Sequence, residues 1–241
     1  METRTALVTG AAQGLGQEFA VALAGRGHRV AGLDLVPQPE TAERVPDYVE
    51  LIADVTDEAQ IASALDLVIE RFGTLHVLVN NAGVYPESAF EDTTPEEWRR
   101  VMRVNLEAPF LMARAVLPHL KAAGWGRIVN ITSAAVLTAP PTMVAYVSSK
   151  AGLIGFTRTL ASALGPYGIT VNAIAPSMVR TATAERTVGA DGGFERVLAR
   201  QAVPRTQEPC DLVSTLLYVV DEGSGFLTGQ TLNVAGGSAY L

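Results

Sequence analysis

A tyrosine and a lysine four positions apart could carry acid/base chemistry. Tyr146 and Lys150 belong to the segment Tyr-Val-Ser-Ser-Lys, near the start of an expected helix, so the phenol and the ammonium share one helix face. A nearby cation favours the phenolate and moves the pKa of a tyrosine from about 10 towards neutrality. Ser133, at the end of a predicted strand, could hydrogen-bond a carbonyl or alkoxide oxygen. By itself such a Tyr/Lys pair is usually a surface coincidence, so the interpretation depends on the accompanying residues.

A glycine-rich turn follows the first predicted strand and reads Gly10-Ala-Ala-Gln13-Gly14-Leu15-Gly16. Gly10 permits a sharp turn, Gly14 lets the backbone approach a pyrophosphate, and Gly16 allows close helix packing. The N-terminus of the following helix offers unpaired N–H groups to phosphates. The spacing G-x-x-x-G-x-G differs from the general fingerprint G-x-G-x-x-G, and glycines in such a turn can be purely structural. We expect this turn, including Gln13 and Leu15, to contact a dinucleotide.

An acidic side chain closes the second predicted strand. Asp34 lies 18 residues after Gly16, where its carboxylate could accept hydrogen bonds from both ribose hydroxyls of an adenosine. A 2′-phosphate about 4 to 5 Å away would cost roughly 3 to 4 kcal/mol, or more than a hundredfold in affinity. No Arg or Lys stands at positions 10–16 or 33–36 to compensate. Unless Asp34 merely caps a turn, it predicts NAD as the cofactor, with Leu35 beside it.

Two further strand ends offer cofactor contacts. Asp54-Val55 could hold adenine between a carboxylate acceptor and an apolar side chain, although Asp54 could equally cap the next helix. Asn81-Ala82-Gly83 brings small residues to a place where backbone passes close to a ribose. Asn-rich turns are common, so this second segment says little alone.

The order of predicted elements indicates how these residues meet. Short β-branched runs alternate with helical patterns. Strands are predicted at 5–9, 30–34, 48–53, 75–80, 127–132, 170–175 and 231–234, and helices near 15–26, 57–72, 95–121, 142–164 and 209–220. Because such strands are apolar on both faces, we expect an α/β fold with a doubly wound parallel sheet, a Rossmann fold, as a single domain over residues 1–241. The polar stretch 181–208 is expected to be a substrate-covering insertion at the carboxyl edge of the sheet.

Composition excludes several other classes of protein. The chain has 241 residues, of which 48% are hydrophobic, and a formal charge of -7, so nucleic acid and anionic lipid are not expected partners. The single cysteine, Cys210, cannot form an intrachain disulfide, and the three histidines are far apart, so no metal site is predicted and a cytoplasmic location fits. We expect neither a secretory signal nor a membrane span, because the longest uncharged run, 128–149, is rich in polar residues and proline.

In combination, these motifs resemble the short-chain dehydrogenase/reductase family over nearly the whole chain. The matching residues are Thr9-Gly10-x-x-x-Gly14-x-Gly16, Asp54, Asn80-Asn81-Ala82-Gly83, Asn105, Ser133, Tyr146-x-x-x-Lys150, Val171-Asn172-x-Ile174-x-Pro176 and Gly229-Gln-Thr-Leu-Asn-Val. The resemblance implies that Ser133, Tyr146 and Lys150 are catalytic. It also implies that Asn105 holds a water linking Lys150 to solvent as a proton relay.

The resemblance extends the expected cofactor contacts to Pro176, Ser177, Val179 and Thr181. Two positions depart from the family pattern. Ser177 stands where glycine is usual, and Ala235 stands where an aspartate commonly precedes the terminal Gly-Gly. They leave the catalytic set intact.

Four segments are similar to the NAD-dependent 1-phenylethanol dehydrogenases within this family. They are Leu35-Val36-Pro37, Tyr85-Pro86, Gly124-Trp125-Gly126-Arg127-Ile128 and Ala175-Pro-Ser177-Met-Val-Arg180-Thr-Ala-Thr183. General family background is the alternative explanation. The likeness implies an apolar or aryl substrate that contacts Tyr85, Met143 and Met178 as well as Ser133 and Tyr146, with uncharged walls at 84–86, 134–144 and 177–179.

The sequence therefore predicts an NAD-dependent oxidoreductase that interconverts a secondary alcohol and a ketone. Two alternatives stay open: a 3-oxoacyl-(acyl-carrier-protein) reductase, which should prefer NADPH and a basic docking face, and a non-catalytic NAD-sensing protein on the same fold. A homotetramer is also expected. Between Thr142 and Leu164 only Lys150 and Arg158 are charged, so the helix is more apolar than one sheet face can cover.

Overall fold

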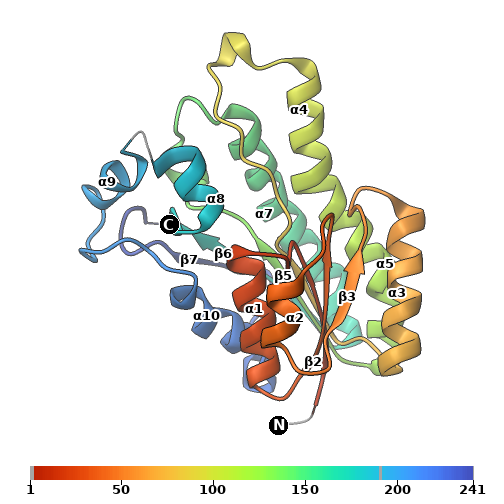
Figure 1. The fold of residues 1–241 in the computed structure, drawn as a ribbon. Coiled ribbons are helices and arrows are strands. Elements are labelled where there is room, and N and C mark those ends of the chain that lie inside the picture. The colour runs from red at the N-terminus through yellow and green to blue at the C-terminus, as the bar shows by residue number, and fades with distance from the viewer. Residues whose placement is uncertain (1–2, 190–191, 241) are drawn as a thin grey trace.

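Seven parallel strands form one sheet in the computed structural model, which describes residues 3–189 and 192–240 (Figure 1). The strand order is β3-β2-β1-β4-β5-β6-β7. The strands are β1 Thr5–Thr9, β2 Arg29–Asp34, β3 Val49–Ile52, β4 Val77–Asn80, β5 Gly126–Ile131, β6 Ile169–Pro176 and β7 Thr231–Val234. The order reverses between β1 and β4, and the crevice at such a switch is where open α/β sheets bind ligands. The predicted doubly wound parallel sheet is confirmed.

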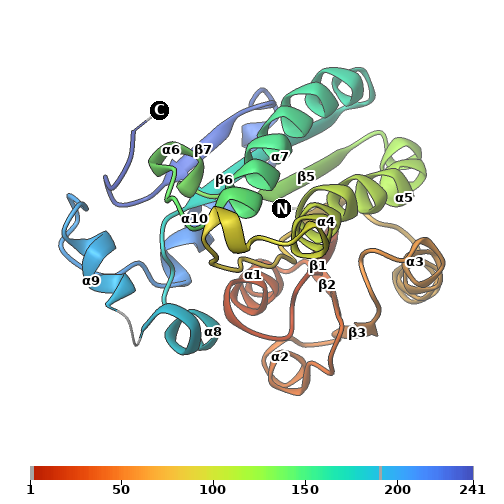
Figure 2. The ribbon, with the colours of Figure 1, turned by 90° about the horizontal axis from the view of Figure 1, so that it is seen from above.

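Helices cover both faces of the sheet (Figure 2). On one face lie α3 Glu58–Phe72, α5 Ala108–Ala123 and α7 Val144–Leu164, and on the other lie α1 Gly14–Gly25 and α10 Cys210–Val220. All five residues of β1 are buried, because both sides of the strand face a helical layer. This explains why the strands appear in the sequence as continuous apolar runs.

The remaining helices are short, and most of them were not predicted. They are α2 Pro39–Arg44, α4 Pro95–Met102, α6 Ala135–Thr138, α8 Ala182–Ala184 and α9 Gly193–Leu198. The helix predicted over 95–121 is α4, a π-helical segment Arg103–Glu107, and α5 in succession. Single-turn helices leave no periodic pattern to detect.

The expected insertion 181–208 contains α8, the π-helical segment Glu185–Gly189 and α9. In Figure 2 these helices stand to one side of the ends of the strands. Residues 190 and 191 of the insertion, and residues 1, 2 and 241 of the predicted domain, lie outside the described residues. None of the helices described here is long and apolar enough to cross a membrane.

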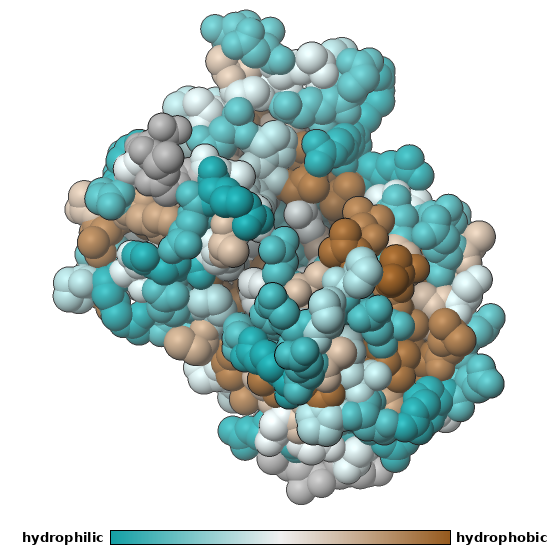
Figure 3. Space-filling view, in the orientation of Figure 1, coloured by the Kyte–Doolittle hydropathy of each residue, from teal (hydrophilic) through white to brown (hydrophobic). Residues whose placement is uncertain are grey.

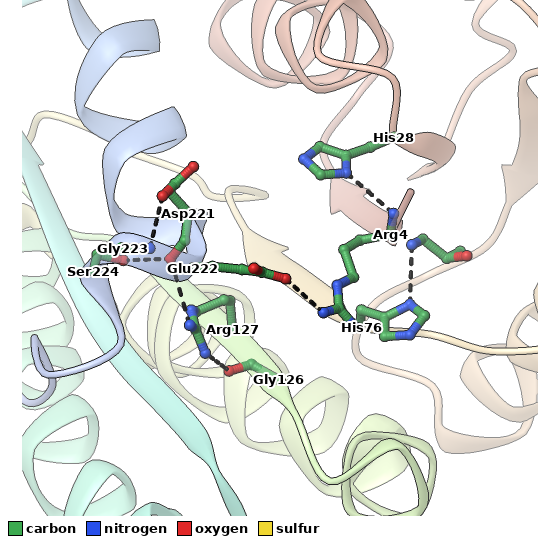
Figure 4. A network of polar contacts seen from close by, with 10 residues as sticks. Arg4, His28, His76, Gly126, Arg127, Asp221, Glu222, Gly223 and Ser224 are labelled. Atoms are coloured by element: carbon green, nitrogen blue, oxygen red, sulfur yellow. Dashed lines mark hydrogen bonds and ion pairs between the residues drawn. The ribbon is translucent and has the colours of Figure 1, made fainter. Parts of the chain in front are cut away.

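Polar contacts close the opposite edge of the sheet, at the amino ends of the strands (Figure 4). The guanidinium carbons of Arg4 and Arg127 lie 4.2 and 4.1 Å from the ring centre of Trp125, and Arg4 pairs with Glu222 at 2.8 Å. The backbone N–H of Arg4 donates to Nδ1 of His28 at 3.3 Å. These side chains join the starts of β1 and β5 to the segment after α10, so this edge serves the fold.

Candidate active site

A cavity of about 1430 Å³ opens at the carboxyl ends of the strands. Most predicted site residues line it: Gly10, Gln13, Gly14, Leu15, Asp34, Leu35, Asp54, Val55, Asn81, Ala82, Gly83, Tyr85, Ser133, Met143, Tyr146, Lys150, Pro176, Ser177, Met178, Val179 and Thr181. Gly16 and Asn105 are the two predicted site residues that do not line it. The fold therefore gathers residues from the whole length of the chain around one space.

The glycine-rich turn forms a bare backbone cradle beside this cavity. Gly10 has a φ of +67°, and a Cβ there would lie 2.9 Å from Nδ2 of Asn81. Gly14 has a φ of +61°, and a Cβ there would lie 3.3 Å from the methyl group of Thr181. A side chain at Gly16 would collide with the carbonyl oxygen of Gly10. All three positions thus require glycine, and the turn leads directly into the N-terminus of α1, as a pyrophosphate site requires.

Asp34 lines the cavity, where it could bind a ribose, and its carboxylate is held by backbone donors. Its Oδ2 accepts a hydrogen bond from the N–H of Ala12 at 2.9 Å, and its Oδ1 accepts one from the N–H of Leu35 at 2.7 Å. Asp34 therefore does cap its own turn, the alternative weighed above, yet it also lines the cavity. A carboxylate oxygen has more than one acceptor direction, so both roles are compatible.

Asp54 does not cap the helix that follows it. Asp57 does, accepting hydrogen bonds from the N–H groups of Ala59 and Gln60 at 2.9 and 3.1 Å. Oδ1 of Asp54 accepts from the N–H of Thr56 at 2.8 Å within a tight turn. Asp54 therefore remains available at the cavity, as the adenine contact requires.

Apolar side chains flank this end of the cavity. Leu35, which lines the cavity, is 66% exposed; Val36 and Ile52, which do not line it but lie close by in the chain or sheet, are 51% and 59% exposed. Hydrophobic residues also gather near the upper ends of the strands in Figure 3. A flat heteroaromatic ring would cover apolar surface of this kind, so the two ends of β2 and β3 fit an adenosine.

Lys150 and Tyr146 stand at the start of α7, at the other end of the cavity. Nζ of Lys150 donates to the carbonyl oxygen of Ile131 at 2.7 Å and lies 5.8 Å from the ring centre of Tyr146. Burial lowers the pKa of Lys150 to about 8. Removal from water raises the pKa of Tyr146, opposed by a hydrogen bond with Ser133. The lowered pKa that the sequence predicted for Tyr146 is thus wrong for this structure. Burial raises the pKa of the phenol, and the ammonium of Lys150 donates to the carbonyl of Ile131 instead.

Ser133 is buried at the end of β5 and is oriented by the backbone after it. Its Oγ accepts a hydrogen bond from the N–H of Ala135 at 3.1 Å. Because the oxygen accepts from the backbone, the hydroxyl can donate its proton towards the cavity, where the phenol of Tyr146 is one partner. Ser133 and Tyr146 can therefore address the same oxygen atom in the cavity.

Asn105 lies fully buried in the π-helical segment Arg103–Glu107. Its Oδ1 accepts from the N–H of Val84, and its Nδ2 donates to the carbonyl of Val84, both at 2.8 Å. Nδ2 also donates to Oγ of Ser149 at 3.1 Å. A Cβ at Gly83 would lie 3.2 Å from Oδ1 of Asn105 and 3.5 Å from Nζ of Lys150, so the space between these groups depends on glycine. A water-relay role for Asn105 stays a prediction.

The loop after β6 carries the family departure at Ser177. The N–H of Ser177 donates to Oε1 of Gln207 at 2.9 Å, and its Oγ lies 3.2 Å from Oγ of Ser238. Nε2 of Gln207 in turn donates to the carbonyl of Val234 at 2.7 Å. Ser177 is therefore built into the polar contacts that join β6 and β7, and the hydroxyl is accommodated without strain.

The wall around the reaction centre is apolar. The ring of Tyr85 lies 6.3 Å from that of Tyr146 at 72°, and Pro140, Pro141, Met143 and Met178 line the same space. The predicted wall residues Val136 and Leu137 are not among the lining residues. They belong to α6, whose first and last residues, Ala135 and Thr138, do line the cavity, and Leu137 is 39% exposed.

The outer part of the cavity is charged, which the sequence analysis missed. Its lining includes Glu87, Glu96, Arg99, Arg100, Arg103, Arg196 and Arg200. Three of these arginines lie close together in the sequence at positions 99, 100 and 103, on α4 and the segment after it. That spacing was the available signal, hidden by the net charge of -7. Across residues 3–189 and 192–240, no three His, Cys, Asp or Glu side chains form a group that could hold a metal ion.

Known proteins with similar sequences and structures are dehydrogenases and reductases. A family model described as enoyl-(acyl carrier protein) reductase matches residues 10–239. The chain is 36% identical to (2S)-[(R)-hydroxy(phenyl)methyl]succinyl-CoA dehydrogenase subunit BbsD of Thauera aromatica, over 100% of this chain and 98% of that protein. It is 39% identical to trans-4-hydroxycyclohexanecarboxylate dehydrogenase of Sinomonas cyclohexanicum, over 97% and 92%. A crystal structure from Sinorhizobium meliloti 1021, designated a short-chain alcohol dehydrogenase, matches with a TM-score of 0.93 and 33% identity, over 99% and 97%.

Proposed function

The chain belongs to the short-chain dehydrogenase/reductase family of oxidoreductases, and we propose that it uses NAD to interconvert an apolar secondary alcohol and its ketone. The observation that carries this proposal is one cavity with Asp34 at one end and Ser133, Tyr146 and Lys150 at the other. A carboxylate that would favour NAD and side chains that could transfer a proton therefore line the same cavity.

The residues at the adenosine end fit a dinucleotide. The glycine cradle leaves room for a pyrophosphate at the N-terminus of α1, and Asp34 offers acceptors to ribose hydroxyls. NAD would supply a nicotinamide ring that exchanges a hydride with the carbinol carbon. Lys150 would bind ribose hydroxyls and favour the ionised form of Tyr146.

Proton transfer is assigned to Tyr146. In alcohol oxidation it would take the hydroxyl proton, and in ketone reduction it would return that proton to the oxygen. The raised pKa of Tyr146 in the ligand-free protein keeps the phenol protonated, which is the form that ketone reduction needs. Ser133, whose hydroxyl can donate its proton into the cavity, would stabilise the developing oxyanion.

The apolar wall supports a neutral substrate close to the reacting carbon. Each buried CH₂ contributes about 0.8 kcal/mol, whereas burying an unpartnered charge costs several kcal/mol. The relative from Thauera aromatica carries in its name a hydroxy(phenyl)methyl group, which is a secondary alcohol next to a phenyl ring. Both observations favour an aryl carbinol of the 1-phenylethanol type.

Two other functions account for less of the site. A 3-oxoacyl-(acyl-carrier-protein) reductase agrees with the description of the family model and with the arginines at the cavity rim, but Asp34 opposes the NADPH that such an enzyme should prefer. A non-catalytic NAD sensor would not need Ser133, Tyr146 and Lys150 in one cavity.

A direct assay tests the proposal. NADH formation is followed by absorbance over a panel of aliphatic, aryl and sugar alcohols, with NADP in parallel. We expect turnover with NAD and with aryl alcohols first. Binding of NAD without turnover of any alcohol would instead support the sensor, and turnover of a 3-oxoacyl thioester with NADPH alone would support the carrier-protein reductase.

We also propose a cytoplasmic homotetramer. Cys210 is the single cysteine of the chain, so the fold has no need of an oxidising compartment. Phe110 on α5 is 45% exposed, and its ring lies 6.5 Å from that of Phe156 on α7. This apolar face supports association between copies of the chain.

A further inference from the structure

A buried glutamine lies four residues after Asp34, the carboxylate to which the NAD preference is assigned. Gln38 follows the exposed residues 35–37 after β2 and is itself 0% exposed. Its Nε2 donates to the carbonyl oxygens of Gly32 at 3.1 Å and Leu51 at 3.0 Å, so its side chain spans β2 and β3. Its backbone N–H donates to Oε2 of Glu50 at 2.9 Å, and its Oε1 accepts from the hydroxyl of Tyr48. Every polar group of the side chain therefore has a partner.

The strand itself is adapted to this glutamine. A Cβ at Gly32, in the middle of β2, would collide with the hydroxyl of Tyr48 and the amide oxygen of Gln38. A glycine inside a strand weakens it unless another group needs the space. Burial, followed by the charges of Glu50 and Asp34, raises the pKa of Tyr48, so its hydroxyl remains a donor.

A second set of contacts reaches the glycine-rich turn from α2. The hydroxyl of Thr41, which is fully buried, donates to the carbonyl of Ala11 at 2.7 Å. Nε2 of Gln17 donates to the same hydroxyl at 3.0 Å. The neighbouring residue Ala12 donates its N–H to Asp34. The turn that donates to the carboxylate of Asp34 is therefore itself fixed by buried polar contacts.

We propose that Gln38 is a positioning residue that fixes Asp34 and thereby sets the preference for NAD over NADP. This inference rests on the proposed NAD preference. The loop 35–37 is exposed to solvent. Gln38 ties the far end of this loop to the carbonyls of Gly32 and Leu51, two residues before Asp34 on β2 and one residue before its β3 partner Ile52. Charge selection depends on distance, because the energy of a charge pair falls as the separation grows. An Asp34 released from its place would lose contacts with the ribose and also repel a 2′-phosphate less strongly.

The test compares Gln38→Met, which keeps the length of the side chain and removes its hydrogen bonds, with the wild type and with Asp34→Ala. Equilibrium dissociation constants are measured for NAD and NADP by calorimetry, and thermal unfolding is followed without cofactor. We expect Gln38→Met to reduce the NAD/NADP affinity ratio about tenfold, the equivalent of one or two net hydrogen bonds. In the Asp34→Ala background the same change should alter the ratio less than about twofold, because the two residues act through one interaction.

Gln207→Met is the matched control. Gln207 is another buried glutamine whose amide joins two backbone segments, but it supports the loop at Ser177. NAD and NADP differ only at the adenosine ribose, so this variant should leave the affinity ratio unchanged even where it weakens both cofactors. If Gln38→Met does not fold, Tyr48→Phe gives the same comparison, because it removes only the hydroxyl that donates to Gln38. We expect it to reduce the NAD/NADP affinity ratio by less than Gln38→Met.

The outcomes separate the inference from the function on which it rests. An unchanged ratio in Gln38→Met or, if that variant is unfolded, in Tyr48→Phe overturns the positioning role, as does an equal loss with and without Asp34. A wild type that binds NAD and NADP equally overturns the proposed NAD preference and the inference with it. A tenfold loss that disappears in Asp34→Ala supports both.

Discussion

The carboxylate of Asp34 accepts a hydrogen bond from the backbone N–H of Ala12 across 2.9 Å. This contact joins the end of β2 to the glycine-rich turn after β1, so the group proposed to select the cofactor and the turn proposed to hold its phosphates are fixed to each other. A 2′-phosphate on the adenosine ribose would meet a carboxylate that cannot move away without breaking this bond.

NAD should therefore bind more than about a hundredfold tighter than NADP. Asp34→Ala should reduce the difference between the affinities for NAD and NADP. Asp34→Asn, which keeps an acceptor for Ala12, should distinguish the effect of the charge from the effect of the hydrogen bond. If the charge of Asp34 sets the preference, the asparagine variant reduces the difference in affinity as much as the alanine variant does. Fluorescence or calorimetric titration of the wild type and both variants with NAD and NADP measures the six affinities. Equal affinities of the wild type for the two cofactors would contradict the charge argument.

Tyr146→Phe should lower kcat by about 10²- to 10⁴-fold, the usual contribution of a positioned proton-transfer group. The affinity for NAD should stay nearly unchanged, because the ring and its packing against Tyr85 are retained. Ser133→Ala should also lower kcat, since the oxyanion loses a donor. A Tyr146→Phe enzyme that kept a substantial rate would rule out the assigned acid/base role.

The sequence predicted the residues whose function depends on their type and their place at a strand end. Gly10, Gly14 and Asp34 follow predicted strands, and parallel strands deliver their ends to one edge, so their convergence followed from the fold. Ser133 follows β5 at the same edge, and Tyr146 lies in the first turn of α7, the long helix that follows this strand end. Backbone topology determines which residues meet at this edge of the sheet, and the topology can be predicted from the hydrophobic periodicity of the sequence.

Side-chain direction was beyond the same reasoning. The four-residue spacing placed Lys150 beside Tyr146 but could not show that its ammonium bonds to the carbonyl of Ile131. Gln38 was missed because its partners, Gly32 and Leu51, are backbone carbonyls on two strands. No periodic pattern marks a contact that exists only after the strands have paired.

Lys150→Met should stabilise the ligand-free protein while removing activity. The ammonium is buried, and burial lowers its pKa from 10.5 to about 8, so the folded state pays a desolvation cost at neutral pH that methionine would not have. We expect a melting temperature higher by a few degrees at pH 7, together with weaker NAD binding.

The pH dependence of this difference checks its cause. Below pH 8 the folded and the unfolded wild type both hold the proton, so the advantage of the variant is constant. Between pH 8 and 10.5 the unfolded state still binds the proton that the folded state has released, so the stability of the wild type rises relative to the variant with pH. Thermal unfolding at pH 7 to 10 measures this. A difference that did not shrink above pH 8 would show that packing, and not the charge, sets the stability.

Association should depend on the apolar face shared by α5 and α7. Phe110→Glu should shift a tetramer to smaller species, because a charge would replace an apolar side chain that is 45% exposed in the single chain. Leu67→Glu on α3 is the control, since Leu67 is similarly exposed at 53% on another helix of the same layer. Sedimentation velocity at micromolar concentration distinguishes the species, and a monomeric wild type would refute the expectation.

The charge of the substrate should matter more than its size. The space around Tyr146 is lined by Tyr85, Met143 and Met178, so a carboxylate next to the reacting carbon would have no partner and would cost several kcal/mol to bury. We expect kcat/KM for 1-phenylethanol to exceed that for a 2-hydroxy acid of similar size. An alcohol whose carboxylate sits at the end of a longer chain should recover part of this loss if the chain reaches Arg200 at the cavity rim, and Arg200→Ala should then remove the recovery. Steady-state rates with the three substrates decide the matter: a ratio of 1-phenylethanol to 2-hydroxy acid below one would overturn the apolar pocket and leave the dehydrogenase assignment in place.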